Sequence, residues 1–555
     1  MDRDHVYLLL LSGRQEDADN FVATHYPECE CIPLSPRELR EGGWRGQIKA
    51  FRRLRGKAFI FFRESLSYVQ EPQLALWSAL LHRCRFTVLA DSAGRTQVST
   101  RWTLIRALPQ SMVSGFCDLL TFALSWCLMR LLRTKPHSLR VHGVPAPDLS
   151  LIYLYPYPLD LTLAGGALSH VKGFLGGLVA NCARCEIFSG KPLPVKEFPV
   201  HLVPAKRRLF LFRESKLLSY NFRFALTVCR RLRGCQAGAL YQRHGRFVFA
   251  GVLLSVFSRL PFILEYNGSE DWFADHWDPA RFRTWLRLGE EVSLARAHLI
   301  VVVSEALRQE LLQRGVSEER ILLNPNGVDP VKFQPGHGGE QVRQQLGISH
   351  ADIVVSFVGT FHYFHGTKVL EQAILLILQS ATAEANVQRL RFLLVGEGLL
   401  QREMREQLQP YVGKQVLFAG LVPHAQIASY LDAADILVSP HVPMPDGRPF
   451  IGSPTKLFEY MAMAKGIIAS NLDQLSSVLN HGSNAWLIEP GNVSELASAI
   501  VLLAQDPDLR NRMGQNARAS ALAKHTWQQN AERVLARVRI GTACEVTAGA
   551  LGRTA

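Results

Sequence analysis

The sequence predicts an α/β protein built from parallel sheets with helices packed on both faces. Two observations predict this class. Short apolar runs alternate with helix-like stretches almost throughout the chain, and turn formers follow many of those runs. Because 48% of the residues are hydrophobic, disordered, collagen-like and low-complexity chains are excluded. A length of 555 residues predicts more than one domain.

Residues 1–105 predict a small α/β unit. Four short apolar runs are its expected strands: Val6–Leu11, Cys29–Pro33, Ala58–Phe62 and Phe86–Ala90. We find no chemical motif in this part of the sequence, so its role stays open.

An apolar helix and a linker are expected over residues 106–148. The stretch 107–129 is uncharged apart from Asp118, and its second half is apolar nearly all round, which indicates burial in protein or in lipid. That half is too short to span a bilayer, and Pro109 and Asp118 dilute the first half. We therefore expect a buried or membrane-dipping helix around 111–133 rather than a spanning one.

Two larger α/β units are expected over residues 149–333 and 340–522, separated by a turn-rich linker and followed by a C-terminal helix and tail over 523–555. Leu149–Tyr155 is the first expected strand of one unit and Ile353–Val358 of the other. Further strands of the second are expected near Phe392–Val395, Val416–Phe418, Ile436–Val438, Gly466–Ala469 and Trp486–Ile488. Two such units facing each other form a cleft at the carboxyl ends of their strands.

Charge and cysteine content narrow the partners and the compartment. Lys and Arg number 62 against 48 Asp and Glu, and this net charge of +14 suits a membrane surface, a phosphate-bearing ligand or nucleic acid. Ten cysteines are too few for a disulfide framework, and the lone Cys182–Cys185 pair is more typical of small buried thiols than of a zinc site. The charged start Met1–His5 does not resemble a signal peptide, so we expect a cytoplasmic protein.

The strongest chemical signal is Ser453-Pro454-Thr455-Lys456, which is expected to begin a helix with Ser453 as N-cap and Pro454 at the first helical position. Backbone N–H groups and the dipole at a helix start attract phosphate, and Lys456 adds a positive charge. Glu459 lies on the same side of the helix, where it suits the vicinal hydroxyls of a nucleotide ribose. The alternative is an ordinary capped helix with an ion pair.

Glycine-bearing turns after successive expected strands converge on one edge of the last sheet, where a ligand approaches the backbone closely. Besides the Ser453 segment, they contain Gly359, Thr360, His365, Gly366, Gly396, Gly398, Gly420, Val422, Ile451 and Gly452. In the preceding unit, Gly165, Gly166 and His170 open a helix after the first strand. That signal is weaker, because packing glycines are common in such turns.

Several motifs occur in a fixed order: Asn324-Pro325-Asn326-Gly327-Val328-Asp329, the Val358-Gly359 turn, Val395–Gly398, Ala434–Ile436, Ser453–Ala464 and Asp506–Gly514. Together they resemble the nucleotide-sugar half of a GT-B glycosyltransferase of family 4. The resemblance is specific over about 295–535 and weaker over 149–294, where 165–173 and 241–270 look like the acceptor-side domain. It does not cover residues 1–145.

The resemblance implies a retaining transfer of a sugar from a nucleotide diphosphate to an acceptor hydroxyl, without a metal ion or other cofactor. Carried over by position, the donor contacts fall on Glu459 for the ribose, on the turns at Gly396 and Gly420–Pro423 for the base, and on Gly359–Thr360 and His365–Gly366 for the diphosphate. Where the family usually has an arginine and a lysine on the diphosphate, this chain has Thr360 and His365. We therefore expect Lys456 to replace them.

The sugar-binding and catalytic positions depart from the family pattern. Ile451 stands where the family often has a second glutamate, so Asp446 or the backbone N–H groups of Ile451 and Gly452 are the expected substitutes. Many members have a histidine where this chain has Asn267, whose amide does not accept a proton in catalysis. Asn267, with neighbouring Glu265 and Glu270, either orients a hydroxyl or only makes a turn. Lys456 is a further catalytic candidate, and the acceptor-side candidates are Gly165, Gly166, His170 and Arg243.

A basic and aromatic segment, residues 206–233, suits an anionic membrane surface, although a nucleic acid or a solvated face fits it too. We expect a peripheral enzyme on the inner membrane face that uses a nucleotide-diphosphate sugar to extend a surface polysaccharide or lipid-linked glycan, with no nucleic-acid partner. One alternative is a catalytically weak nucleotide-sugar-binding or scaffold subunit. Another is a nucleotide-sugar epimerase on the same fold.

Overall fold

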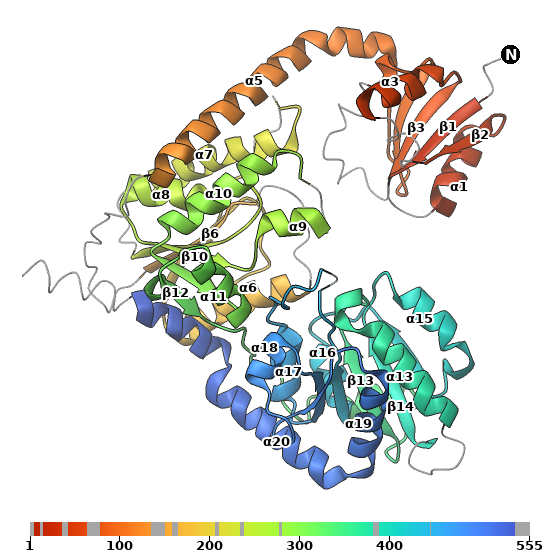
Figure 1. Cartoon of the computed structure of the whole chain (residues 1–555), viewed down its shortest axis with the longest axis vertical. Helices are drawn as coiled ribbons and strands as arrows, with labels where there is room; N and C mark the ends of the chain where they lie inside the picture. The colour runs from red at the N-terminus through yellow and green to blue at the C-terminus, as the bar shows by residue number, and fades with distance from the viewer. Residues whose placement is uncertain are drawn as a thin grey trace, which may run out of the picture.

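The computed structural model describes residues 5–11, 15–35, 43–63, 78–134, 150–157, 165–205, 210–232, 238–276, 280–380, 388–444 and 446–538. Within these residues the strands form three sheets of five, seven and six strands, which Figure 1 shows as three separate layers of arrows with helices packed against them. The second and third sheets make two Rossmann-like domains, the N-domain and the C-domain of a GT-B fold. The first sheet belongs to an additional N-terminal unit.

The N-terminal unit has the strand order β2-β1-β3-β4-β5, in which the first four strands are parallel and β5 is antiparallel to β4. The four expected strands are confirmed. β5 was not expected, because most of its residues are exposed and it contains no apolar run. The elements are β1 (His5–Leu10), α1 (Gln15–His25), β2 (Glu30–Leu34), α3 (Gly43–Arg53), β3 (Ala58–Arg63), β4 (Phe86–Asp91) and β5 (Thr96–Ser99).

The N-domain sheet is parallel throughout, with the order β12-β11-β10-β9-β6-β7-β8. Its strands are β6 (Ser150–Tyr155), β7 (Arg184–Ser189), β8 (Val200–Leu202), β9 (Ala239–Arg243), β10 (Phe262–Tyr266), β11 (Leu299–Val302) and β12 (Ile321–Leu323). Its helices are α6 (Gly165–Ala180), α7 (Arg213–Leu232), α8 (Ala250–Ser258), α9 (Glu270–His276), α10 (Arg283–Arg296) and α11 (Glu305–Gln313). Of the Cys182–Cys185 pair, only Cys185 is buried, so the expectation of two buried thiols is wrong for Cys182.

The C-domain sheet is also parallel, with the order β15-β14-β13-β16-β17-β18. All six expected strands are confirmed: β13 (Ile353–Val358), β14 (Leu390–Val395), β15 (Val416–Gly420), β16 (Ile436–Ser439), β17 (Gly466–Ser470) and β18 (Trp486–Ile488). The helices are α12 (Gly339–Gln345), α13 (Thr367–Ser380), α15 (Gln401–Gln407), α16 (Ile427–Asp432), α17 (Thr455–Ala462), α18 (Asp473–Val478), α19 (Val493–Gln505) and α20 (Pro507–Lys524).

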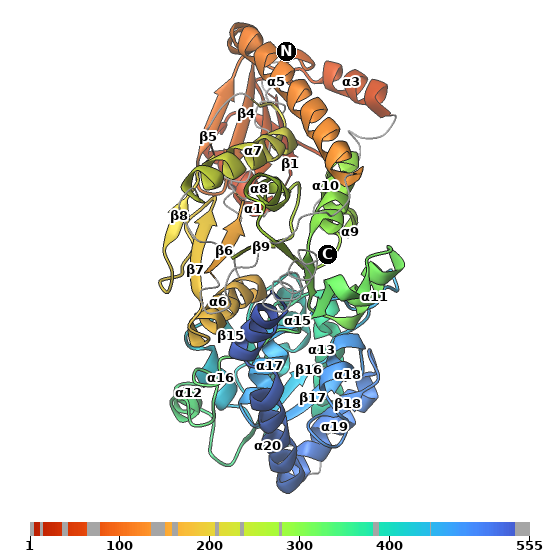
Figure 2. The same ribbon diagram turned by 90° about the vertical axis from the view of Figure 1, so that its left-hand side faces the viewer.

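The chain returns from the C-domain to the N-domain at its C-terminal end. Helix α20 packs on α17, and a helical segment over 527–538 then packs on the N-domain, in the dark blue part of the ribbon in Figure 2. The Trp527 ring fills the space beside α6 that Gly173 leaves, where a Cβ would lie 2.0 Å from it. The two domains are therefore joined behind the cleft, and the carboxyl ends of their strands face each other across it.

A single long helix, α5 (Arg101–Thr134), connects the N-terminal unit to the N-domain (Figure 1). It begins ten residues before the expected start and includes Pro109. Among the described residues, Ile105–Arg133 of this helix is long and apolar enough to cross a membrane. The expected linker that follows lies outside the described residues from 135 to 149.

Candidate functional site

A cavity of about 930 Å³ lies between the two domains, within the range of small-molecule sites. Loops at the carboxyl ends of both parallel sheets line it. The expected residues that line it are Gly359, Thr360, His365, Gly396, Val422, Gly452, Ser453, Pro454, Lys456 and Glu459 from the C-domain, and Gly166, His170, Arg243, Asn267 and Glu270 from the N-domain. Gly165, Glu265, Gly366, Gly398, Gly420 and Ile451 were also expected at the site but are not part of this lining.

The start of α17 differs from the expected cap. The helix begins at Thr455 after Pro454, and no side chain in the described part of the chain caps it. Ser453 instead bonds across the cleft: its Oγ accepts from the Asn326 backbone N–H at 3.1 Å, and its carbonyl accepts from Asn326 Nδ2 at 2.5 Å. Ser453 is therefore not the N-cap. The first N–H groups of α17 remain available to an anion in the cavity.

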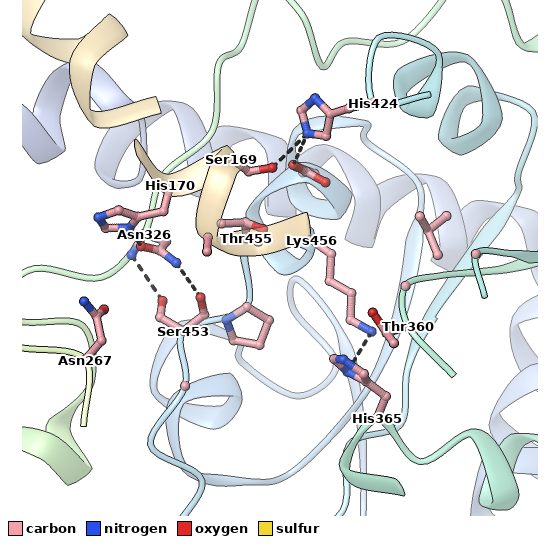
Figure 3. A pocket seen from close by; sticks show the side chains of 18 of the residues that line it. Ser169, His170, Asn267, Asn326, Thr360, His365, His424, Ser453, Thr455 and Lys456 are labelled. Carbon is pink, nitrogen blue, oxygen red and sulfur yellow. Dashed lines mark hydrogen bonds and ion pairs between the residues drawn. The ribbon is translucent and has the colours of Figure 1, made fainter. Parts of the chain in front are cut away.

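Lys456, in the first turn of α17, is only 8% exposed. Its Nζ lies 4.4 Å from the centre of the Phe357 ring. It also lies 3.5 Å from His365 Nδ1, as Figure 3 shows. Burial lowers the pKa of Lys456 to about 7, against the opposing effect of Glu459. A Cβ at Gly359 would lie 3.2 Å from Nζ, so the glycine leaves room for the ammonium group.

Two histidines beside Lys456 are neutral. His365 Nδ1 lies 3.1 Å from His441 Nε2. Burial, together with the Lys456 charge, holds the pKa of both rings well below the ordinary histidine value. Because His365 carries no charge, Lys456 is the cationic side chain at the end of the cavity where the resemblance puts the diphosphate.

Glu459 lies one helical turn beyond Lys456 and is equally buried. Burial raises the pKa of its carboxyl to about 7, although Lys332 and Lys456 act in the opposite direction. The His424 ring lies 4.0 Å from Glu459 and also contacts Ser169 Oγ at 2.9 Å and Lys332 Nζ at 2.7 Å. His424 thereby connects α6 of the N-domain to the ribose-binding candidate, and Figure 3 shows its contact with Ser169.

Glu265 lies behind the N-domain wall of the cavity and is fully buried. Its carboxylate accepts hydrogen bonds from Tyr241 OH at 2.8 Å and Asn267 Nδ2 at 2.7 Å, and it lies 3.0 Å from both His170 Nε2 and Arg243 Nη1. Burial alone would raise the pKa of Glu265, but His170 and Arg243 hold it well below its usual range. Glu265, expected as a catalytic residue, thus positions three side chains that line the cavity.

A hydrogen-bonded chain connects this carboxylate to the C-domain. His170 Nδ1 lies 2.6 Å from Asn326 Oδ1, and Asn326 in turn donates to Ser453. Asn326 was not expected at the site. The sequence feature that could have indicated it is the Asn-Pro-Asn-Gly motif. Nothing in the local sequence, however, shows that Asn326 bonds to the C-domain on the other side of the cleft.

Ile451 and Asp446 do not provide a substitute for the missing glutamate. Ile451 packs against the N-domain core, and its carbonyl accepts from Ser304 Oγ at 2.8 Å. Asp446 accepts from Trp272 Nε1 at 2.8 Å and does not line the cavity. Of the groups expected to replace the glutamate, only the backbone N–H of Gly452 belongs to a residue that lines the cavity.

Gly366 has a structural role. Its φ is +66°, and a Cβ there would lie 1.6 Å from the Pro440 carbonyl oxygen. This close approach of two loops requires glycine, whether or not a ligand is bound.

The comparisons with known families agree with this geometry. The model of the family described as Glycosyltransferase Family 4 matches residues 164–332, and that described as Glycosyl transferases group 1 matches residues 352–506. The two matches fall on the two domains that enclose the cavity. Neither includes the N-terminal unit or α5.

Two curated relatives illustrate the extent of the similarity. D-inositol 3-phosphate glycosyltransferase of Nocardia farcinica is 27% identical over 255 residues, 45% of this chain and 54% of the relative. The chain thus spans about half the length of that relative. An uncharacterized glycosyltransferase of Methanocaldococcus jannaschii is 22% identical over 388 residues, 67% of this chain and 93% of the relative.

Solved structures share the fold. HepE of Anabaena, solved in complex with UDP, is 20% identical with a TM-score of 0.53, and the match covers 70% of this chain and 98% of HepE. Sucrose-phosphate synthase of Thermosynechococcus elongatus is 20% identical with a TM-score of 0.54, and the match covers 71% of this chain and all of that one. At these identities the likeness shows the fold alone.

Proposed function

Because the chain belongs to the GT-B glycosyltransferases of family 4, we propose that it moves a sugar from a nucleotide-diphosphate sugar to a hydroxyl of a glycan or lipid-linked acceptor. The transfer retains the anomeric configuration and needs no metal ion. One observation carries the proposal: the uncapped start of α17, the Lys456 ammonium and the Glu459 carboxylate lie together in a cavity between the domains. A nucleotide-diphosphate sugar offers a group for each of them: its phosphates for the helix start and the ammonium, and its ribose hydroxyls for the carboxylate.

The donor end of the cavity suits the nucleotide and its two phosphates. Ionised Glu459 accepts hydrogen bonds from the two ribose hydroxyls. Lys456 and the N–H groups at the start of α17 face the diphosphate, with Thr360 beside them. These groups are fixed before the reaction, so they stabilise the charge that develops on the leaving diphosphate.

The acceptor end orients hydroxyls and does not remove their protons. Asn267 donates its amide N–H to Glu265, which leaves its carbonyl oxygen to accept from a substrate hydroxyl. In the transfer, the bond between the anomeric carbon and the phosphate oxygen breaks and a bond to the acceptor oxygen forms on the same face. The acceptor proton passes to the departing phosphate oxygen, so no side-chain base is required.

The similar proteins support the substrate classes. HepE was also solved in complex with UDP-glucose, which supports a nucleotide-sugar donor. The amylovoran biosynthesis glycosyltransferase of Erwinia amylovora is 24% identical over 212 residues, and a putative teichuronic acid biosynthesis glycosyltransferase of Bacillus subtilis is 24% identical over 252. These names support an acceptor in surface polysaccharide synthesis.

The test is nucleotide release from UDP-, GDP- and ADP-sugars, with EDTA present and a membrane extract as the source of acceptor. We expect one nucleotide to be released, with no effect of EDTA. Glu459→Gln keeps the shape of the side chain and removes its charge, so the affinity for that donor should fall at least tenfold, about 2 kcal/mol for hydrogen bonds to a charged group. The control is Glu403→Gln in α15, which lies outside the cavity.

The alternative function is a catalytically weak nucleotide-sugar-binding or scaffold subunit. Ile451 and Asn267, which stand where the family has a glutamate and a histidine, are the observations that favour it. Donor binding without release, when the wild-type chain is offered the full extract, would replace the first proposal with this one. A changed donor sugar formed without acceptor would indicate an epimerase.

A further inference from the structure

Helix α5 presents an unusually large apolar surface. Trp102, Met112, Phe116 and Leu119 are 65–74% exposed. Further exposed apolar side chains along the helix are Val113, Leu120, Leu124, Trp126 and Leu131. Met112, Phe116, Leu120 and Leu124 are spaced four residues apart, and Val113, Leu119 and Trp126 lie beside them, so these side chains form an apolar strip along one side of the helix from Met112 to Trp126.

The opposite side of α5 is fixed to the N-domain. The Asp118 carboxylate accepts from the Leu211 backbone N–H at 2.9 Å and from Ser215 Oγ. Four residues further on, Phe122 packs against the Trp285 ring, and its carbonyl accepts from Trp285 Nε1 at 2.9 Å. The one charge between 107 and 129 is therefore buried against protein, and the exposed strip from Met112 to Trp126 contains none.

Basic residues flank the strip. Arg106 lies before it and Arg130 lies at its other end, with the Arg130 guanidinium 5.0 Å from the centre of the Trp126 ring. Arg133 is paired with Glu291 at 2.7 Å, and Arg101 donates to the His82 carbonyl. Neighbouring α7 adds exposed Arg230 and Arg231 beside exposed Leu226, and α8 adds exposed Phe257. Figure 2 shows α5, α7 and α8 on the side of the molecule toward the viewer.

We propose that this side of α5 is a docking surface for an anionic lipid bilayer, on which the helix lies in the plane of the membrane interface. An apolar strip inserts among the acyl chains while basic residues at its ends meet anionic headgroups. The helix does not span the bilayer, because Asp118 and Phe122 hold it lengthwise on α7 and α10. A second copy of the chain fits less well, since both copies would carry the same basic flanks and a net charge of +14.

The proposal revises the expectation for the basic and aromatic segment. In α7, Tyr220 and Phe224 are buried in the N-domain core, so these rings are not available to lipid. In the proposed docking, the described part of this segment supplies positive charge to the membrane surface, and α5 supplies the apolar side chains that insert into the bilayer. Residues 206–209 and 233 of that segment lie outside the described residues.

The experiment is flotation of the full chain with vesicles of phosphatidylcholine alone or mixed equally with phosphatidylglycerol. We expect the chain to float with the mixed vesicles and much less with phosphatidylcholine alone. Phe116→Glu/Leu120→Glu places two carboxylates on the strip one helical turn apart, which should reduce the bound fraction at least about tenfold. The control Leu376→Glu/Leu399→Glu changes two exposed leucines of the C-domain and should float like wild type.

The outcomes separate docking from misfolding and self-association. The strip variant should keep the wild-type melting temperature and donor affinity, because both residues are exposed and far from the cavity lining. Flotation of the strip variant equal to wild type would overturn the proposal. A wild-type dimer in light scattering that neither floats nor survives the substitutions would identify a second copy as the true occupant. Flotation, melting temperature and light scattering do not depend on the donor chemistry, so the docking proposal can fail or succeed independently of the proposed function.

Discussion

At the scale of single residues, the site combines two opposite charges that are both unfavourable to bury. Lys456 and Glu459 are each 8% exposed, and burial moves both of their pKa values toward neutrality, to about 7. A buried charge without full compensation costs stability, and it persists where a ligand supplies the missing partner. The two residues therefore connect stability, pH and donor binding.

Replacement of Lys456 by methionine should separate stability from function. The variant removes a buried ammonium group and keeps the packing on Phe357, so the free energy of unfolding should rise by about 1–3 kcal/mol. The gain should be larger at pH 6 than at pH 8. Because burial lowers the folded-state pKa of Lys456, its penalty is complete below that pKa and is relieved as the pH rises above it.

The affinity of the Lys456→Met variant for the donor should fall, because the diphosphate of the donor no longer meets the Lys456 ammonium group. Chemical denaturation at both pH values and calorimetric binding of the donor measure the two effects. Lys414→Met, which changes an exposed lysine of the same domain, is the control. A variant that is no more stable than wild type at pH 6 would show that the ammonium is compensated within the protein.

Donor binding should move protons in a direction that changes sign near pH 7. At pH 6, Glu459 is largely protonated and must release its proton to accept from the ribose, whereas Lys456 is already charged. At pH 8 Glu459 is already ionised, and Lys456 must take up a proton to meet the diphosphate. The esterified phosphates of a nucleotide sugar do not titrate in this range.

Calorimetry in buffers of different ionisation enthalpy should therefore show net release at pH 6 and net uptake at pH 8, each approaching about one proton. Glu459→Gln should abolish the release and Lys456→Met the uptake. A proton count near zero at both pH values in wild type would contradict the assignment of these two residues to the donor.

At the scale of elements, close loop packing predicts how individual glycines respond to substitution. Gly366 and Gly447 both have positive φ, at +66° and +74°. A Cβ at Gly366 would meet the Pro440 carbonyl, whereas nothing lies within 4 Å of a Cβ at Gly447. Gly366→Ala should lower the free energy of unfolding by about 3 kcal/mol or more and Gly447→Ala by about 1 kcal/mol. Equal losses in urea unfolding would show that the Pro440 loop moves away freely.

The strands of the C-domain were predictable because they are short apolar runs buried on both faces of a parallel sheet. The sequence pattern places most of the loops after them at the cavity. The role of Ser453 was not predictable, because its partner Asn326 is 127 residues away and displaces the local helix cap. The surroundings of Glu265 were not predictable for a related reason: its residue type suggests catalysis, and only the fold shows that Tyr241, Asn267, His170 and Arg243 surround its carboxylate.

Helix α5 shows that amino-acid composition alone does not determine the surroundings of an apolar helix. Its apolar pattern is equally compatible with burial in protein and in lipid, and the sequence does not tell which side is covered. The contacts of Asp118 and Phe122 settle that question for one face only.

At the scale of the whole molecule, polar contacts across the cleft hold the two domains in one relative position. They connect Ser169 to His424, Asn326 to Ser453, Ser304 to the Ile451 carbonyl, and Trp272 to Asp446. The first two also include residues of the cavity lining. The arrangement that completes the donor site is thus the same arrangement that these bonds stabilise.

The Trp272–Asp446 hydrogen bond lies away from the donor, so it tests this coupling without touching the ligand. Trp272→Phe keeps an aromatic ring and removes the N–H. If the lost bond is worth about 1 kcal/mol, the closed population falls and the dissociation constant of the donor rises, by at most about fivefold. X-ray scattering of the free protein should show a larger mean radius of gyration. Trp486→Phe, a substitution in β18 outside the cleft, should change neither quantity. An unchanged dissociation constant for Trp272→Phe would mean that the covalent connections and the return of the chain at Trp527 alone set the domain arrangement.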